Sequence, residues 1–150
     1  MTDASTRGRR NRANGNAAEA AVARWLRPWY PDACRAVRNT VPDPGDLDCT
    51  APGLYWSIKN TQQDRIGPWM AELDAKRDDR IGLLVVRRRG HASPGAWWCH
   101  MRLHTLADLT GGMIQSEDAR SAVARIELRD VMDLLVQACY ARRPTERRAS

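Results

Sequence analysis

The chain has 150 residues and a formal net charge of +6, so we expect one domain that favours anionic partners. Apolar residues make up 43% and charged residues 28%, an ordinary balance for a globular protein with a real core. No stretch approaches the roughly 20 apolar residues of a membrane span, and no apolar h-region follows the N-terminus. The composition therefore argues against membrane insertion and secretion. The scattered cysteines contain no CxxC pair and are typical of reduced thiols in a cytoplasm.

The positive charge is concentrated at the two ends of the chain. Residues 1–13 contain four arginines and one acid, and residues 142–150 contain the same number of each. The segment between them is therefore neutral. The N-terminal arginines are Arg7, Arg9, Arg10 and Arg12. Basic arms on a neutral domain can grip a phosphate backbone without reading sequence, whereas the alternative is a pair of disordered tails that only keep the protein soluble.

The first half of the chain predicts a helix followed by short strands. Apolar residues recur at helical spacing over residues 16–29. A short strand over residues 34–39 precedes the turn sequence Val41-Pro-Asp-Pro-Gly45. Residues 46–50 and 54–60 then predict two strands, which we expect to pair as a hairpin through the intervening Ala-Pro-Gly.

The second half predicts a buried strand between helices. Helical spacing covers residues 65–80, and the apolar run over residues 81–88 is the best candidate for a central strand. A loop leads to a returning strand over residues 96–103 and a short helix over residues 104–110. Residues 117–143 look mostly helical, with a break near residues 125–128. This order predicts an α/β fold with a mixed central sheet flanked by helices.

Chemistry-bearing residues gather at two of the expected strands. Side chains alternate along a strand, so Ser57 and Lys59 share a face while Ile58 points into a core. Pairing of the expected hairpin would bring Asp46 beside Lys59. Carboxylates attract a divalent cation such as Mg²⁺, and a lysine can position or deprotonate a water and neutralise phosphate charge. This combination is suited to cutting a phosphodiester.

The order Glu19, then Gly45-Asp46-Leu47, then Ser57-Ile58-Lys59 resembles the PD-(D/E)XK nuclease superfamily. More closely, it is similar to the Holliday junction resolvases of archaea and their relatives in actinobacterial phages. The resemblance runs from Arg7 to about Leu103. It implies a restriction-endonuclease-like fold, Glu19 and Asp46 as ligands of Mg²⁺ or Mn²⁺, and Lys59 as the catalytic lysine.

The same resemblance implies a function, and together with the charge distribution it divides the chain into segments, the helical region from residue 113 lying outside the resemblance. The substrate would be DNA, in the form of a four-way junction during DNA recombination, and its two-fold symmetry suits a homodimer. The cytoplasm of a bacterium or of a phage-infected host would be the location. Residues 1–13 would form a basic arm, 14–112 the nuclease-like domain, 113–142 a C-terminal helical extension and 143–150 a basic tail.

One position departs from the family pattern. The family has Glu, Asp or Gln where this chain has Ser57, and a neutral hydroxyl is a poorer Mg²⁺ ligand than a carboxylate. Ser57 is therefore assigned an orienting or water-mediated role. Asp48 or Glu72 could replace the missing acid, or Gln62 or Gln63 could supply an amide oxygen. Alternatively, the domain has lost cleavage and only binds DNA.

Further arginines and aromatic residues are candidates for DNA contact. Phosphates can be held by arginines without base readout, and the candidates outside the N-terminal arm are Arg38, Arg87, Arg88 and Arg89. One of Trp97 and Trp98 could stack on a base or cover a dimer contact, because neighbours on a strand face opposite ways. His100 and His104, near Cys99, lack a second cluster that would complete a metal site, so we interpret them as strand and surface histidines.

Other interpretations stay open at this point. Glu19 follows Asn16 by three residues and could close a capping box at a helix start, and Asp46 could be a simple turn residue. The fold could also serve a restriction-type or repair nuclease that cuts linear duplex. A different class is an α/β adaptor whose basic tails bind an acidic protein partner.

Overall fold

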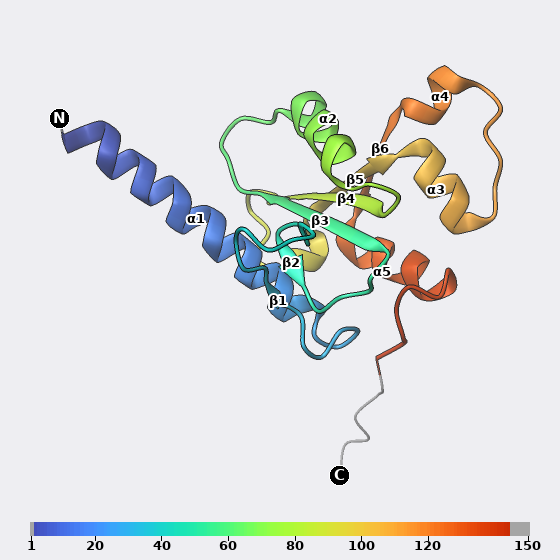
Figure 1. The fold of residues 1–150 in the computed structure, drawn as a ribbon, viewed down its shortest axis with the longest axis horizontal. Coiled ribbons are helices and arrows are strands. Elements are labelled where there is room, and N and C mark those ends of the chain that lie inside the picture. Colours follow the sequence, from blue (N-terminus) through green and yellow to red (C-terminus); the bar gives the residue numbers. More distant parts are fainter. Residues whose placement is uncertain (1, 145–150) are drawn as a thin grey trace, which may run out of the picture.

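The computed structural model describes residues 2–144, and its sheet is covered by helices on both sides (Figure 1). In chain order the elements are α1 (Thr2–Leu26), β1 (Cys34–Arg35), β2 (Leu47–Asp48), β3 (Leu54–Lys59), α2 (Ile66–Lys76), β4 (Ile81–Val86), the 3₁₀ turn η1 (Pro94–Ala96), β5 (Trp98–Arg102), α3 (Leu103–Thr110), α4 (Glu117–Ser121), β6 (Val123–Glu127) and α5 (Leu128–Gln137). Within the described residues, no helix is both long and apolar enough to cross a membrane.

The central sheet is mixed, with the strand order β3-β4-β5-β6. Strands β3 and β4 are parallel because α2 carries the chain back between them, whereas β5 and β6 join in antiparallel pairs. The register places Ser57 beside Leu84 and Lys59 beside Val86. The expected α/β class with a mixed, helix-flanked sheet is thus confirmed.

The two faces of β3 pack against different helices. Trp56 and Ile58 belong to the larger core, which includes Val22 and Leu26 of α1 and several residues of α5. Tyr55 belongs to a smaller core with residues of α2. Strand β4 is buried over residues 82–86, as its apolar run predicts. The alternation expected for β3 is confirmed, and it leaves Ser57 and Lys59 half-buried on the α2 side.

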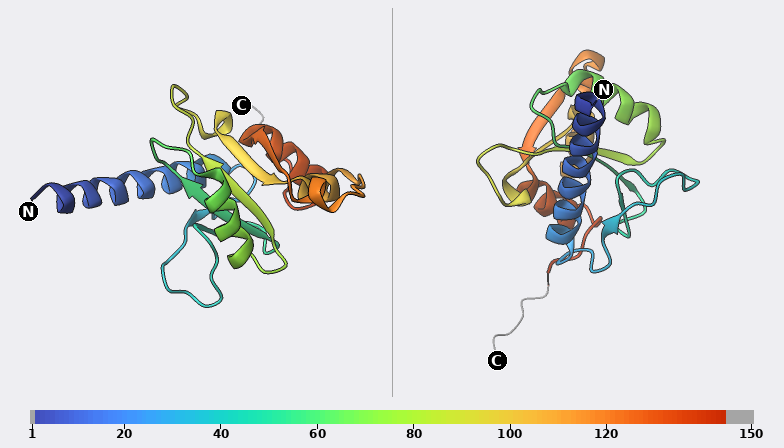
Figure 2. Two further views of the ribbon diagram at one scale, coloured as in Figure 1. Left: turned by 90° about the horizontal axis from the view of Figure 1, so that it is seen from above. Right: turned by 90° about the vertical axis from the view of Figure 1, so that its left-hand side faces the viewer.

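The first helix is much longer than its apolar pattern predicts. Helix α1 starts at Thr2 and ends at Leu26, whereas the pattern predicts residues 16–29. Its first half extends away from the rest of the molecule (Figures 1 and 2) and buries none of residues 4–14. The N-terminal arm is therefore helical, and the disordered-tail interpretation is wrong for this end. Hydrophobic periodicity reports only a packed face, so it could not detect a helix in solvent.

Two further expectations about secondary structure are corrected. Strand β2 pairs antiparallel with β1 in a separate two-stranded sheet, so the hairpin expected between residues 46–50 and 54–60 does not form. Residues 117–143 contain the helices α4 and α5, but the helical expectation missed the strand β6 between them, whose partner is β5. In β6, Ala124 and Ile126 pack on the core with period two, and the expected break near residues 125–128 falls at the boundary between β6 and α5. Most of the basic C-terminal tail, residues 145–150, lies outside the described residues.

Candidate active site

Asp46 is held against β3 by a close backbone approach at the preceding glycine. Gly45 has a φ of 83°, and a Cβ atom there would lie 2.6 Å from the carbonyl oxygen of Trp56. Only glycine fits this conformation and this contact without strain. The amide of Asp46 donates to the carbonyl oxygen of Trp56 at 2.8 Å, and the amide of Ile58 donates to Asp46 Oδ2 at 2.6 Å. Asp46 is thereby placed beside β3 without the expected hairpin.

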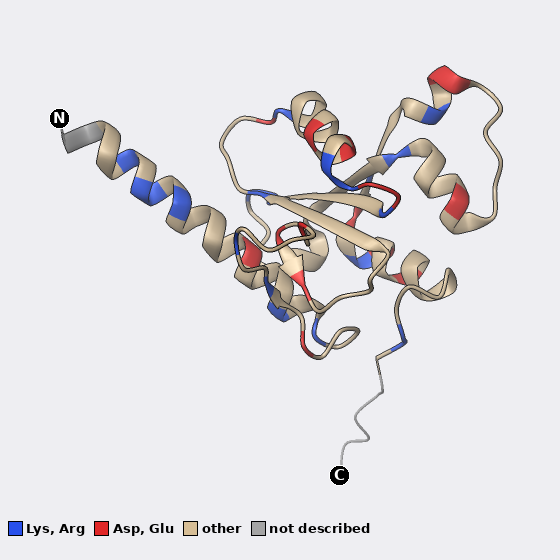
Figure 3. Ribbon diagram, in the orientation of Figure 1, with Lys and Arg blue, Asp and Glu red and all other residues tan. Residues whose placement is uncertain are grey.

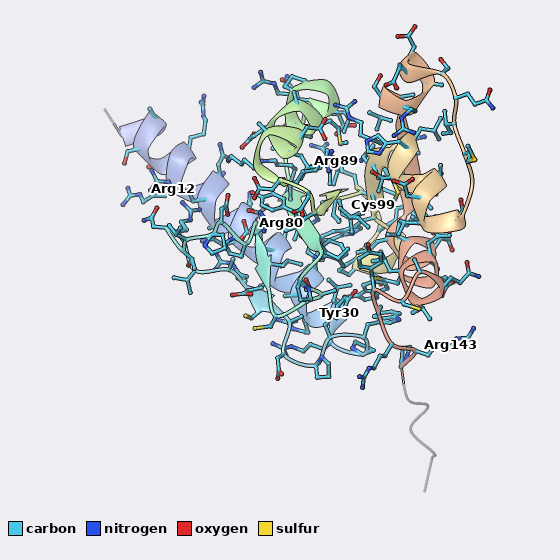
Figure 4. All side chains as sticks on the ribbon, turned by 45° about the vertical axis from the view of Figure 1, so that its right-hand side comes forward. Arg12, Tyr30, Arg80, Arg89, Cys99 and Arg143 are labelled. Atoms are coloured by element: carbon cyan, nitrogen blue, oxygen red, sulfur yellow. The ribbon has the colours of Figure 1, made fainter. Side chains whose placement is uncertain are left out.

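The loop before Asp46 is anchored by a second carboxylate. Asp43 Oδ1 accepts from the amide of Gly45, and its Oδ2 accepts from the hydroxyl of Tyr55 at 2.9 Å. Arg80 donates to the carbonyl oxygen of Asp43 at 2.8 Å, and its guanidinium lies 4.7 Å from the centre of the Tyr55 ring. Arg80 lies in the middle of the molecule in Figure 4. The hydrogen bond from Gly45 is the main reason that the pKa of Asp43 is lowered.

Glu19 enters the site from the packed half of α1. Its side chain is 16% exposed, and its Oε2 accepts from Arg35 Nε at 2.9 Å. Arg35 also donates to Asn16 Oδ1 at 2.7 Å. Because α1 begins at Thr2, Asn16 and Glu19 lie inside the helix, so the capping-box interpretation is wrong. Arg35 of β1 instead fixes both side chains.

These residues line two neighbouring hollows in the surface. The larger has a volume of about 430 Å³, and its lining includes Glu19, Arg38 and Asp46. The smaller, of about 40 Å³, is lined by Asp46, Ser57, Lys59 and Glu72 among others. Asp46, Tyr55 and Lys76 line both. The structure therefore brings Glu19, Asp46, Ser57 and Lys59 together from α1, the start of β2 and the end of β3.

Asp46 is the electrostatic centre of this group. Burial is the largest effect on it and raises the pKa of Asp46, and the negative charges of Glu19 and Asp43 act in the same direction. The amide of Ile58 and the ammonium of Lys59 oppose this rise. A buried carboxyl whose pKa is raised by burial and by neighbouring carboxylates is one whose ionised form a bound cation would stabilise.

Lys76 of α2 belongs to the site, although the sequence pattern does not single it out. Its Nζ donates to Glu72 Oε1 at 3.0 Å. That hydrogen bond raises the pKa of Lys76 and lowers the pKa of Glu72, and Asp43 and Asp46 also contribute to the shift of Lys76. Two signals in the sequence are consistent with this position. Glu72 and Lys76 have the i,i+4 spacing of a helical ion pair, and only two of the 24 basic residues are lysines.

Several candidates lie away from the hollows. Exposed Asp48 accepts from the amide of Cys49 and stands opposite Cys34 in the β1–β2 register. Neither Asp48 nor Gln62 or Gln63 lines the two hollows in the described part of the chain. Glu72 is thus the one acid of the two suggested replacements that lies at the site, and there it pairs with Lys76.

The arginines that follow β4 are largely occupied by neighbouring side chains. Arg88 pairs with Glu127 at 3.1 Å and lies 4.2 Å from the centre of the Trp98 ring, which Arg125 also covers at 4.5 Å. Arg87 lies over the ring of buried Trp97. These contacts reduce the surface that either tryptophan offers to a base. Arg89 is exposed.

The donor set at the hollows fits a divalent cation that retains several waters. Across residues 2–144, no three His, Cys, Asp or Glu side chains are placed to hold a metal ion together. Glu19 and Asp46 supply two carboxylates, and a cation would stabilise the ionised form of Asp46, whose pKa is raised first by burial and then by repulsion from Glu19 and Asp43. Mg²⁺ commonly binds through one or two carboxylates with water in its remaining positions. This set therefore suits Mg²⁺ better than a metal that requires a full protein cage.

The interpretation of this site rests on its geometry. No protein-family model, no curated protein and no solved structure matches this chain.

Proposed function

We propose that the protein is a metal-dependent DNA endonuclease with a restriction-endonuclease-like fold that cuts four-way junctions as a Holliday junction resolvase. One observation carries the proposal. Glu19, Asp46 and Lys59 are distant in the sequence, yet Glu19 and Lys59 line two neighbouring hollows that share Asp46, and the charges of both act on the pKa of that carboxylate. The resemblance of their order to the PD-(D/E)XK nucleases adds the substrate class. A cytoplasmic homodimer with two such sites would match the two-fold symmetry of a junction.

Each residue has a role that its position permits. Glu19 and Asp46 would hold Mg²⁺ or Mn²⁺, which when bound stabilises phosphate charge and acidifies water. Lys59 lies near Asp46 at the end of β3 and would orient the attacking water and neutralise the scissile phosphate. Ser57 shares that face of β3, and its hydroxyl would orient a water at the position where an acid is missing.

The basic helix α1 provides a path for DNA beside the site. Four of its five arginines lie on the half that extends into solvent (Figure 3), where Figure 4 labels Arg12, and the fifth, Arg24, lies in its last turn. Asn60, directly after Lys59, donates to the carbonyl oxygen of Asn14 at 3.1 Å, so the end of β3 adjoins this half of α1. Arg12 is two helical turns before Glu19, about 10 Å along the axis and on the same side. We therefore expect a DNA strand to pass from Lys59 to Arg12.

Removing arginines from the two sides of α1 should have unequal effects. Around the helix axis, Arg12 is about 20° and Arg9 about 80° from Glu19, whereas Arg7 and Arg10 are about 120° and 180° away. We expect Arg9→Ala/Arg12→Ala to weaken junction binding about tenfold and to lower the slope of log affinity against log salt by about 2. The matched pair Arg7→Ala/Arg10→Ala should change both much less. Junction binding measured in EDTA at several salt concentrations tests this expectation. Equal losses of affinity in the two double variants would contradict a DNA path along one side of α1.

The function is tested with a labelled immobile four-way junction and a linear duplex of the same length. Each is incubated with the protein in Mg²⁺, Mn²⁺ or EDTA, together with Lys59→Ala and the surface control Arg129→Ala, whose side chain is exposed on α5. We expect paired nicks in the junction that need the metal, fall about 10²–10⁴-fold in Lys59→Ala and persist in the control. Equal cutting of both DNAs would indicate a restriction or repair nuclease.

A second candidate is a DNA-binding module that does not cut. Ser57 in place of an acid and the absence of a third carboxylate ligand among the described residues favour it. It predicts tight junction binding that neither EDTA nor Lys59→Ala weakens, and it predicts no strand scission. Weak binding to both DNAs, with no preference for the junction and no cutting, would contradict both candidates and support an adaptor with an acidic protein partner.

A further inference from the structure

Two exposed thiols meet at the end of the small β1–β2 sheet. Cys34 begins β1, and Cys49 directly follows β2. Both are free and exposed. The register pairs Cys34 with Asp48, so Cys49 is one residue beyond the position directly opposite, and its left-handed φ of 58° turns the chain at the end of the strand. The Cys34 thiol is near enough to raise the pKa of the Cys49 thiol. The two cysteines are therefore neighbours at one end of the sheet, although 14 residues lie between them in the chain.

The other two cysteines lie in different surroundings. Cys99 of β5 is fully buried in the larger core and lies in the interior in Figure 4. Cys139 is exposed just after α5. The chain thus contains internal controls for a buried thiol and for an exposed single thiol.

The strand register is compatible with the geometry of a disulfide. Opposed residues of an antiparallel pair have Cα atoms about 4.5–5.5 Å apart, and disulfides span Cα separations of about 4.4–6.8 Å. Cys49 is one step from the residue opposite Cys34, and its left-handed backbone ends the alternation of side chains along β2 at this point. We propose that Cys34 and Cys49 form a redox modification site, which closes reversibly as an intramolecular disulfide.

The reaction needs a two-electron oxidant, either a peroxide or a small-molecule disulfide. With hydrogen peroxide, one thiolate attacks an oxygen and releases hydroxide, and the second thiolate displaces a second hydroxide from the resulting sulfenic acid as the S–S bond forms. The two protons lost by the thiols convert both hydroxides to water. With glutathione disulfide, a mixed disulfide forms first, and the second thiolate then displaces the second glutathione. Two protein thiols are oxidised, and one peroxide or one disulfide is reduced.

Closure of this bond would fasten the base of a loop at the larger hollow. Residues 35–48 lie between the two cysteines and include Arg35, Arg38, Asp43 and Asp46, which line it. Strands β1 and β2 pair over only two residues each. Val41, near the middle of the loop, is 93% exposed. A covalent link at the base should therefore restrain a segment that the short ladder holds weakly.

The site is tested on the full chain without reference to DNA cleavage. The protein is treated with hydrogen peroxide or glutathione disulfide, alkylated with iodoacetamide, and analysed by mass spectrometry after protease digestion. We expect two fewer alkylated thiols, a linked peptide pair containing Cys34 and Cys49, and full reversal by dithiothreitol. Cys34→Ser and Cys49→Ser should each abolish the linked pair, whereas Cys139→Ser should leave it unchanged.

The restraint on the loop has a separate readout. We expect oxidation to slow trypsin cleavage after Arg38 at least several-fold in the wild type and in Cys139→Ser, but not in Cys34→Ser. Oxidation that yields only intermolecular dimers, or bonds that include Cys139, would overturn the proposed site. A linked pair with unchanged trypsin cleavage would overturn the restraint of the loop. Circular dichroism of each exposed Cys→Ser variant verifies that its fold is intact.

Discussion

Asp46→Asn is expected to make the protein more stable while it abolishes metal-dependent DNA cleavage. The pKa of Asp46 is raised by burial and by repulsion from Glu19 and Asp43. A carboxyl with a raised pKa in the folded state contributes stability that is complete below its unfolded pKa and is lost as the pH rises through the folded value. At neutral pH the ionised group therefore destabilises the fold. Asn removes the charge and keeps an oxygen that accepts from Ile58.

Thermal unfolding against pH measures the stability effect. Asp46→Asn should unfold at a higher temperature than the wild type at pH 7, and the difference should shrink as the pH falls below the pKa of Asp46. Asp43→Asn is the matched control with the opposite sign, because the pKa of Asp43 is lowered. That variant should be less stable than the wild type at pH 7, with the difference shrinking toward acid pH.

Cleavage and cation binding measure the functional effect. Loss of one of two carboxylate ligands should reduce junction cleavage by at least about 100-fold. Added Mg²⁺ should raise the unfolding temperature of the wild type by mass action, and it should have little effect on Asp46→Asn. Retained cleavage in Asp46→Asn would remove Asp46 from the proposed mechanism, and a lower stability would contradict the electrostatic account of its surroundings.

Gly45→Ala should displace the same carboxylate without changing any charge. A Cβ atom at residue 45 would lie 2.6 Å from the carbonyl oxygen of Trp56, so the segment would have to move off β3. The left-handed backbone costs about 1–2 kcal/mol for a residue other than glycine, and loss of the bond between the Asp46 amide and Trp56 adds about 1 kcal/mol. Cleavage should fall about 100-fold, as expected for a misplacement near 1 Å.

Gly90→Ala is the matched control for this substitution. Gly90 has a φ of 78°, close to that of Gly45, but no atom lies within 4 Å of its added Cβ. Gly90→Ala should therefore lower the free energy of unfolding only by the cost of the left-handed backbone, and it should cut the junction at the wild-type rate. Urea denaturation gives both free energies of unfolding, and cleavage is compared where both variants are folded. Equal loss of stability in the two variants would show that the contact with Trp56 is unimportant.

Local patterns in the sequence determined those parts of the fold whose stabilisation is local or whose burial is complete. The apolar run of β4, the alternation around Ser57 and Lys59, and the packed half of α1 each follow from one period of hydrophobicity. The candidates Glu19, Asp46 and Lys59 could likewise be chosen from residue type and order alone. The type of each side chain and its place in the sequence are known before its neighbours in the folded protein are known.

Tertiary contacts decided what those patterns left open. Strand β2 pairs with β1, and strand β6 pairs with β5. The stability of a strand depends on which neighbouring strand it pairs with, and that neighbour is known only in the folded protein. Asp46 reaches β3 because Gly45 permits a close backbone approach, which no periodicity encodes. Lys76 joins the site, and Cys34 meets Cys49, because packing brings together segments distant in the sequence. The sequence identifies the candidate site residues, but their neighbours are decided by the folded structure.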